Sequence, residues 1–239
     1  MELKKIILKP GKDKSLRRFH PWVFSGALKI INEGTKEGDV VEVFSNKEKY
    51  LGTGHYQEGS ITIRLFEFIQ QKIDLEYWTK KIMKAIYLRK SLSFIDNKET
   101  NIYRLIHAEG DDLPGLIIDY YNGTAVIQCH SIGMWLLKET FCEVLRSKMK
   151  NLVAIYDKSA ETLAPKHVEL HAIKNQFLFG EENAIFEGLE YNNKFSINWL
   201  TGQKTGFFLD QRENRKLLGE ISNGKKILNI KNYKILYEI

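Results

Sequence analysis

The sequence predicts an α+β protein with a small N-terminal β-barrel, a central α+β domain and the start of a third domain. Three observations predict this order. Short strand patterns separated by Gly and Asn turns fill residues 1–70. An amphipathic pattern over residues 74–94 precedes strand, strand, helix and strand patterns. A polar loop bracketed by Gly202 and Gly206 then leads into another helical pattern. The predicted domains are 1–72, 73–182 and 183–239.

Four strand patterns account for the predicted barrel. Gly52 and Gly54 interrupt the third pattern, and glycines inside a strand mark a bulge or a bend where a barrel closes. The four predicted strands are 6–8, 39–44, 50–56 and 60–66.

Positive charge is concentrated at the start of the chain. The net charge is +6 and the pI about 9.1, and residues 1–18 carry seven Lys and Arg against two acidic residues. This balance favours a polyanionic partner, while a solvated charged face is the alternative. Arginine and aromatic side chains together are typical of RNA binding. The predicted RNA-binding residues are Lys12, Arg17, Arg18, His20 and Trp22.

Two of the aromatic residues in this region have another interpretation. Trp22 and Phe24 can instead fill the core of the barrel. Burial statistics favour this alternative for Trp22, whereas for the arginines we favour RNA.

The central domain is predicted to begin with a helix that Asp74 caps. Its apolar stripe is Leu75, Trp78, Ile82, Ala85 and Ile86, with lysines elsewhere on the surface. Asn122-Gly123 predicts a tight hairpin between two of the strands that follow. The further predicted elements are strands at 103–107, 115–121, 125–129 and 153–156, a helix at 134–149, and a hairpin of 184–187 with 194–199 around Asn192-Asn193.

Neither carboxylates nor cysteines indicate a metal or catalytic centre. Glu109, Asp111, Asp112 and Asp119 lack the spacing of a calcium loop, and a Pro-Gly turn explains the segment. We therefore predict no metal site. His167 and His171 lie in an alternating, strand-like pattern and are predicted to be exposed. Cys129 and Cys142 are predicted to be buried free thiols of a cytoplasmic protein, and no apolar run is long enough to span a membrane.

Three stretches resemble one family. GQKTGFFLDQRENR at 202–215 resembles the segment before the catalytic domain of S-adenosylmethionine-dependent methyltransferases that modify cytosine C5 in large-subunit ribosomal RNA. RLIHAEGDDLPGLIID at 104–119 is similar to the central domain of that family. HPWVFSGA at 20–27 is similar to its N-terminal PUA domain, a small RNA-binding β-barrel. The three motifs occur in the family's order and cover residues 1–230.

The resemblance implies a function for the loop between Gly202 and Gly206 and for the residues that follow it. It implies S-adenosylmethionine as the cofactor of the full-length family, ribosomal RNA as the partner, and a cleft where the two meet. Alternatively, Arg212 and Arg215 pair with Glu213 and Glu220 on a helix surface. The implied rim of the cleft comprises Gln203, Lys204, Thr205, Phe208, Asp210, Arg212 and Arg215.

The resemblance ends at the first strand of the family's Rossmann-like sheet, predicted at 227–230. A glycine-containing loop for the methyl donor should follow, but no glycine occurs after Gly224, and the later Pro-Pro and cysteine motifs are absent. We therefore expect a truncated methyltransferase that keeps RNA binding, binds no cofactor and has no catalytic residue. The alternatives are a stand-alone RNA-binding module and a non-functional truncated gene product; a homodimer is left open.

This truncation has a structural consequence. A helix over 210–221, with Asp210 and Glu213 as a capping box, would lack most of the sheet on which it should pack. We therefore expect it to expose Leu217, Leu218 and Ile221.

Overall fold

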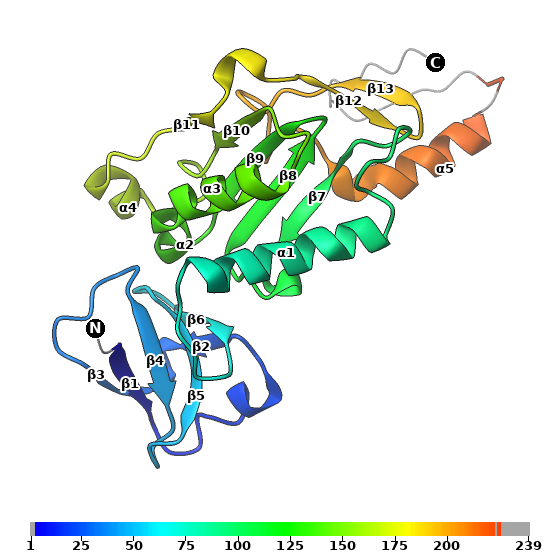
Figure 1. The fold of residues 1–239 in the computed structure, drawn as a ribbon. Coiled ribbons are helices and arrows are strands. Elements are labelled where there is room, and N and C mark those ends of the chain that lie inside the picture. The colour runs from blue at the N-terminus through cyan, green and yellow to red at the C-terminus, as the bar shows by residue number, and fades with distance from the viewer. Residues whose placement is uncertain (1–2, 223, 226–239) are drawn as a thin grey trace. The chain divides into compact units, whose positions relative to one another are not determined.

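The computed structural model describes residues 3–222 and 224–225, and Figure 1 shows its fold. The chain divides into two compact units, Met1–Phe207 and Phe208–Ile239. The first unit holds a six-stranded N-terminal sheet and a five-stranded central sheet with helices packed on it. The fold is therefore mixed α+β, as the sequence predicts.

The N-terminal sheet has the strand order β2-β6-β5-β4-β1-β3. All four predicted strands are present, but two short strands that bracket a 3₁₀ turn were missed because neither alternates. Buried aliphatic side chains such as Ile6, Val41 and Ile63 form its core. The strands are β1 (Lys4–Leu8), β2 (Trp22–Phe24), β3 (Leu28–Ile31), β4 (Val40–Phe44), β5 (Tyr50–Tyr56) and β6 (Ile61–Glu67).

The bulge predicted in the third strand pattern is confirmed. The register between β5 and β6 shifts between Thr53 and Gly54. A Cβ atom on Gly54 would lie 2.4 Å from the carbonyl oxygen of Arg64, so the two backbones approach too closely for any other residue.

The central sheet has the order β11-β10-β9-β8-β7. Asn122 and Gly123 both have positive φ, 45° and 101°, and form the predicted tight turn between β8 and β9. β9 and β10 are parallel and are connected through two helices. The strands are β7 (Ile102–His107), β8 (Leu116–Tyr121), β9 (Thr124–Cys129), β10 (Ala154–Asp157) and β11 (Gln176–Phe179).

The helices of the central domain confirm some predictions and correct others. Asp74 caps α1 (Leu75–Ser91) by accepting from the Tyr77 amide at 3.1 Å, but Leu75 is exposed rather than part of the buried stripe. The single helix predicted at 134–149 is in fact two, α2 (Ile132–Leu136) and α3 (Lys138–Lys148), which meet at Leu137.

The prediction for His167 is wrong in both respects. This residue lies in α4 (Pro165–Leu170), where Pro165 occupies the first turn, and it is buried. Its Nε2 atom lies 3.1 Å from Oε2 of Glu37, which comes from the segment before β4. The alternating pattern was misleading because the buried side of this helix is set by a tertiary contact; His171 is exposed, as predicted.

The two sheets of the first unit share a core at His55 and Phe66. His55 of β5 is buried, with its ring 4.8 Å from the ring of Phe66 and 6.1 Å from that of Trp78 in α1. A Cβ atom on Gly133 of α2 would collide with the His55 ring, at 2.3 Å from Cγ. Burial lowers the pKa of His55 to about 3. The N-terminal sheet is thus joined to the central domain by an aromatic cluster that holds a neutral histidine.

One face of the central sheet carries α1 and α3, and a later segment covers part of the other face. The predicted hairpin is present, shifted by a few residues, as β12 (Glu187–Glu190) and β13 (Asn193–Ser196), with its turn at Tyr191-Asn192. The buried Trp199 then stacks on Tyr121 of β8 at 5.9 Å between ring centroids.

The second unit contains a 3₁₀ turn, η5 (Leu209–Gln211), and α5 (Arg212–Ser222). Asp210 lies inside η5 rather than immediately before the α-helix, so the predicted capping position is wrong. Leu217, Leu218 and Ile221 are exposed, as expected. The strand predicted at 227–230 and the tail that follows it lie outside the described residues.

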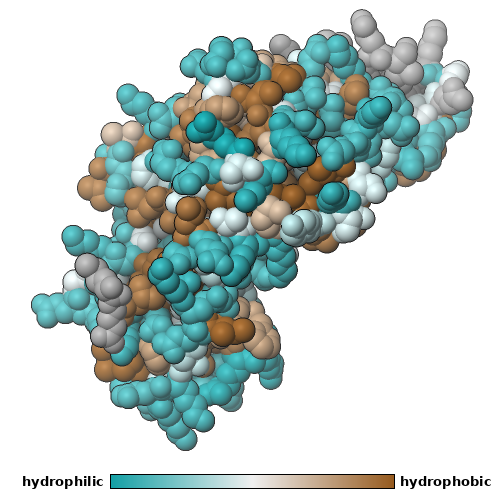
Figure 2. All heavy atoms as spheres, in the orientation of Figure 1, coloured by the Kyte–Doolittle hydropathy of each residue, from teal (hydrophilic) through white to brown (hydrophobic). Residues whose placement is uncertain are grey.

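The surface is mixed in character. On the face shown in Figure 2, hydrophilic residues surround smaller hydrophobic groups over both the N-terminal and the central sheet. Across the residues that the structure describes, no helix is both long and apolar enough to cross a membrane.

The neutral His55 predicts a specific acid sensitivity. Since its pKa is about 3 in the folded state and 6.5 without burial, stability present above pH 6.5 is lost as the pH falls. Between pH 7 and pH 5 this histidine should remove about 2 kcal/mol of unfolding free energy. His55→Phe keeps an aromatic ring and should remove that loss, as measured by urea unfolding at both pH values.

The control is His171→Gln, which removes an exposed histidine and should leave the loss assigned to His55 in place. An unaltered loss of stability in His55→Phe would contradict this assignment.

Candidate nucleic-acid interface

The face of the central sheet opposite α1 and α3 carries a buried carboxylate. Asp119 of β8 is fully buried, and its two oxygens accept from Nε and Nη2 of Arg104 at 2.8 and 3.0 Å. Arg104 lies on the neighbouring strand β7, where it is the register partner of Asp119. This bidentate pair holds the guanidinium at a fixed place on the sheet face.

The loop 202–206 is anchored to the same carboxylate. Thr205 is fully buried, and its hydroxyl donates to Oδ2 of Asp119 at 2.5 Å. The Tyr121 hydroxyl lies 2.8 Å from the Thr205 hydroxyl, and the Lys158 ammonium donates to the carbonyl of Gly202. Burial lowers the pKa of Lys158. The loop is therefore a fixed part of the sheet face rather than a free surface segment.

The glycines of this loop are required by close packing. A Cβ atom on Gly202 would lie 2.0 Å from the Asn198 carbonyl oxygen. Gly206 has φ +107° and lies against the Trp199 backbone. Gln203 and Lys204 between them are exposed, so two of the predicted rim residues face solvent while Thr205 serves as the anchor.

The other predicted rim residues belong to the second unit. Arg212 is buried at the start of α5, and Asp210 is exposed. Arg215 is half-buried, and its guanidinium donates to the Phe208 carbonyl at 2.8 Å.

The basic arm lies at the rim of the N-terminal sheet. Lys12, Arg17, Arg18 and His20 are all exposed. Arg17 pairs with Asp13 at 2.7 Å, and this arginine contact lowers the pKa of Asp13. The 3₁₀ turn η1 (Leu16–Arg18) presents the two arginines side by side in sequence at the surface.

Trp22 has a role that the sequence did not indicate. It is half-buried, and its indole N–H donates to Oε1 of Glu109 at 2.8 Å, which links the N-terminal sheet to the central domain. His20 and Phe24 contact its ring edge-to-face, at 5.6 and 6.5 Å. Phe24 is exposed and Trp22 is only half-buried, so the interpretation that these residues fill the barrel core, which burial statistics favour for Trp22, is wrong for both.

Two further side chains, Arg64 and His130, lie near the Trp22–Glu109 contact. Arg64 is the register partner of Trp22, and burial lowers its pKa while Glu109 opposes that shift. Burial lowers the pKa of His130, at the end of β9, and the nearby Arg64 lowers it further. Sequence analysis missed these residues and also Arg104 and His107, because three separate strands bring them together.

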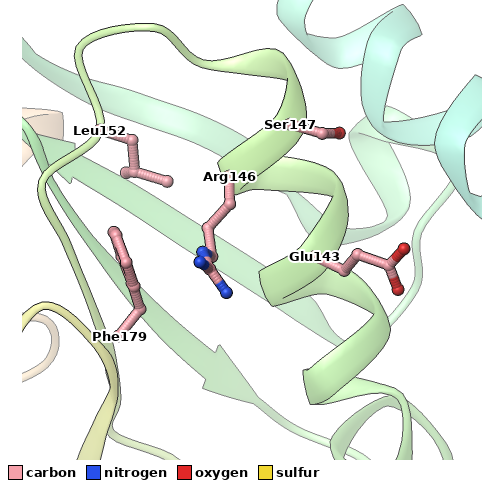
Figure 3. A pocket seen from close by; sticks show the side chains of 5 residues that line it. All are labelled: Glu143, Arg146, Ser147, Leu152 and Phe179. Carbon is pink, nitrogen blue, oxygen red and sulfur yellow. The ribbon is translucent and has the colours of Figure 1, made fainter.

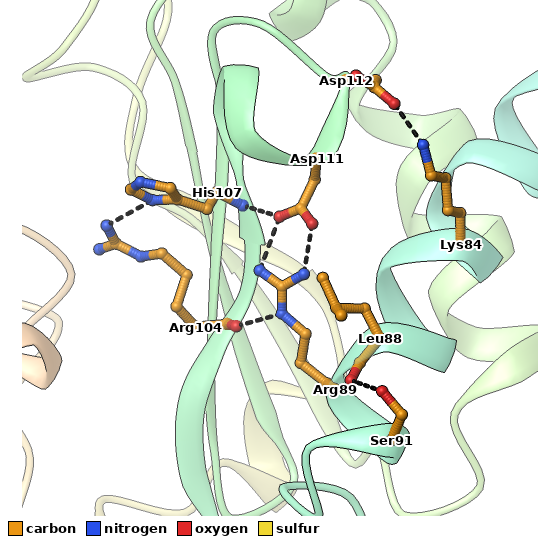
Figure 4. A network of polar contacts seen from close by, with 8 residues as sticks. All are labelled: Lys84, Leu88, Arg89, Ser91, Arg104, His107, Asp111 and Asp112. Atoms are coloured by element: carbon orange, nitrogen blue, oxygen red, sulfur yellow. Dashed lines mark hydrogen bonds and ion pairs between the residues drawn. The ribbon is translucent and has the colours of Figure 1, made fainter.

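The short segment that holds Glu109 is fixed by a buried ion pair. Arg89 of α1 donates to both oxygens of Asp111, and its Nη2–Oδ2 distance is 2.7 Å (Figure 4). The His107 amide also donates to Asp111, at 2.6 Å. Figure 4 shows Arg104 and His107 on the opposite side of β7 from this pair. The ion pair thus fixes the position of η3 (Ala108–Asp111), the segment that holds Glu109.

The four acidic residues considered for a metal each contact a different group. Glu109 accepts from Trp22, Asp111 from Arg89, Asp112 from Lys84 and Asp119 from Arg104. In the described part of the chain, no three His, Cys, Asp or Glu side chains are arranged to hold a metal ion.

A hollow beside α3 is a weaker candidate for a functional site. Its volume is about 380 Å³, and it is lined by Glu143, Arg146, Ser147, Leu152 and Phe179 (Figure 3). The Arg146 guanidinium already stacks 4.3 Å from the Phe179 ring centroid. The sheet face with its basic rim is therefore the better candidate site.

The two cysteines are buried, as predicted. Burial raises the pKa of both the Cys129 and the Cys142 thiol. A thiol of raised pKa is a poor nucleophile, so neither residue has the properties of a catalytic cysteine.

This combination defines a class: a PUA-like sheet joined to an α+β domain, with Arg64, Arg104 and His130 near the junction. A PUA-like domain matches residues 6–68. The chain is 36% identical over 228 residues to the ribosomal RNA large subunit methyltransferase I of Shewanella amazonensis, and 37% over 229 residues to that of Photobacterium profundum. Each match covers 94% of this chain and 56% of the relative, so the chain spans about half the length of these relatives.

Solved structures support the same fold. A putative SAM-dependent methyltransferase from Streptococcus mutans has a TM-score of 0.74 at 22% identity, covering 91% of this chain and 55% of its own. A putative methyltransferase complexed with SAH has a TM-score of 0.73 at 22% identity, covering 90% and 53%.

The buried Arg89–Asp111 ion pair should contribute more to the free energy of unfolding than the exposed Lys84–Asp112 pair. Arg89→Met leaves the Asp111 carboxylate buried without its cation, which should cost about 3–5 kcal/mol of unfolding free energy. Lys84→Met removes the exposed partner of Asp112 on the same helix and should cost less than about 1 kcal/mol. Urea unfolding of both variants checks this, and equal costs would show that the buried pair has no special role.

The loop anchor gives a separate prediction. Thr205→Val keeps the shape of the side chain but removes a hydrogen bond to a buried carboxylate, which should cost about 1.5–3 kcal/mol. Hydrogen exchange at residues 202–206 should accelerate in this variant. Thr201→Val, at an exposed threonine five residues before Gly206, is the control, and similar exchange in the two variants would contradict the anchoring role.

Proposed function

We propose that this chain is the RNA-holding part of an S-adenosylmethionine-dependent ribosomal RNA methyltransferase. One observation carries the proposal: the exposed basic and aromatic rim of the N-terminal sheet lies beside Arg64, Arg104 and His130, which are near one another where the two sheets meet. Such a surface suits structured RNA, because cations contact phosphates and aromatic rings stack on unpaired bases. Similarity to ribosomal RNA large subunit methyltransferase I supports the choice of RNA.

Within this proposal the parts of the chain have different tasks. Residues 1–72 act as the RNA-binding PUA-like domain, 73–182 as the central platform, and 183–239 as a hairpin followed by the start of the methyltransferase domain. Lys12, Arg17, Arg18 and His20 contact RNA directly, whereas Trp22 holds Glu109 and joins the two sheets. Gln203 and Lys204 extend the surface from the anchored loop.

The chemistry of the proposed reaction follows from the resemblance of the three motifs. The methyl donor is S-adenosylmethionine and the target is C5 of a cytosine. Addition to the pyrimidine ring needs an activated nucleophile, and the buried Cys129 and Cys142 do not supply it. RNA capture and positioning are therefore the tasks that we assign to the described residues.

Binding to ribosomal RNA fragments tests the proposal. The double variant Lys12→Ala and Arg18→Ala should weaken binding and reduce the slope of log K against log[salt] by about 0.7–0.9 for each phosphate that the protein no longer neutralises. Fluorescence anisotropy over a series of salt concentrations measures both. Arg64→Gln should weaken binding as well, because Arg64 lies at the junction of the two sheets, near His130.

Lys148→Ala, at an exposed lysine of α3 on the helix side of the sheet, is the matched control and should leave the slope unchanged. The proposal fails if the wild-type chain does not bind the fragments, or if the control loses as much affinity as the rim variant.

A further inference from the structure

A cavity opens beside the basic rim, where the N-terminal sheet meets α1 and η3. Its volume is about 330 Å³, within the range of small-ligand sites. Aromatic and charged side chains line it together, an unusual mixture for a cavity that serves only as a packing defect. They include Phe19, Phe68, Glu67, Lys81, Glu109 and Asp112.

Phe19 lines this cavity and has a backbone conformation of raised free energy. It has φ +61°, in the left-handed region that a bulky residue rarely adopts, and 71% of it is exposed. Its amide caps η1 by donating to the Leu16 carbonyl at 2.9 Å, and its ring contacts Phe68 edge-to-face at 5.4 Å. A large aromatic ring is thus held in a fixed place while most of its surface faces solvent, which is the arrangement of a stacking platform.

The carboxylates of the cavity are fixed by hydrogen bonds. Oε1 of Glu109 accepts from the Trp22 indole at 2.8 Å. Oε1 of Glu67 accepts from the amides of Phe68 and Ile69 at 2.8 and 2.9 Å. A carboxylate oxygen has more than one acceptor site, so each group retains the capacity to accept further hydrogen bonds.

Two of the three carboxylates of the cavity are paired with cations. Lys81, which also lines the cavity, lies 3.6 Å from Glu67 and donates to the Phe66 carbonyl at 2.8 Å, and Lys84 pairs with Asp112. Glu109, which the Trp22 indole holds, is therefore the carboxylate that we consider for a ligand. Arg17 and Arg18 immediately precede Phe19 and are exposed. A phosphate is repelled by Glu109 and attracted to the arginines. The part of an RNA that enters should therefore be a base edge rich in hydrogen-bond donors.

We propose that this cavity binds one unpaired nucleobase bearing an exocyclic amino group, stacked on Phe19 and hydrogen-bonded to Glu109. The inference rests on the proposed RNA-binding function and specifies the class of nucleotide that this site selects. Cytosine, adenine and guanine each present an amino group to a carboxylate acceptor. Uracil has no amino group, and its one N3–H donor lies between two carbonyl oxygens that the Glu109 carboxylate repels, so oligouridine is the disfavoured ligand.

Labelled single-stranded oligocytidine, oligoadenosine and oligouridine, with the full chain, test this assignment. The wild-type chain should bind the first two about tenfold more tightly than oligouridine. Phe19→Ala should weaken binding of the preferred oligonucleotides about tenfold, because the stacking surface is removed. Tyr87→Ala removes another exposed aromatic ring, on α1 outside the cavity, and should change nothing.

Glu109→Gln separates recognition from structure. Glutamine still offers an oxygen to the Trp22 indole, but its amide hydrogens oppose an amino group. The ratio of oligocytidine to oligouridine affinity should fall toward one, whereas a merely structural defect would weaken all oligonucleotides alike. Equal binding of the three oligonucleotides by the wild-type chain, or unchanged binding by Phe19→Ala, overturns the inference. Ribosomal RNA binding that persists in either case leaves the proposed function standing.

Discussion

The buried carboxylate of Asp119 is the constraint on which the sheet face depends. In one direction it holds Arg104 by a bidentate ion pair, and in the other it accepts from Thr205 and so fixes the loop 202–206. A fully buried carboxylate requires such partners, since an uncompensated charge in the interior is strongly destabilising. Asp119 thus connects the partly exposed guanidinium of Arg104 to the loop that carries Gln203 and Lys204.

The union of the two sheets determines how the surface is assembled. Phe66 and His55 reach into the central core against Trp78, and Trp22 donates to Glu109 at the edge of the same junction. These contacts place Arg64 of the N-terminal sheet near His130 of the central one. The proposed RNA surface is therefore a property of the joined unit, and neither sheet presents it alone.

The positions of the charged side chains underlie the proposal that one region contacts both phosphate and base. Arg17 and Arg18 lie outside the cavity, whereas Glu67 and Glu109 lie within it, and Phe19 stands between the two sets. Electrostatic attraction to phosphate contributes affinity for any RNA, while fixed acceptors beside an aromatic ring contribute selectivity. The two proposed functions are separable because we assign them to different side chains.

The sequence by itself determined the features that depend on local backbone chemistry: the Asp74 cap, the Asn122-Gly123 turn and the bulge at Gly54 all lie where the pattern placed them. The fold class followed from the order of these elements. Only the tertiary structure decided that His167 is buried and that Thr205 anchors its loop to Asp119 instead of lining a rim. It also decided that Arg64, His130 and Arg104 lie near one another. The physical reason is that such contacts join residues far apart in the chain, and no local propensity encodes which of them meet.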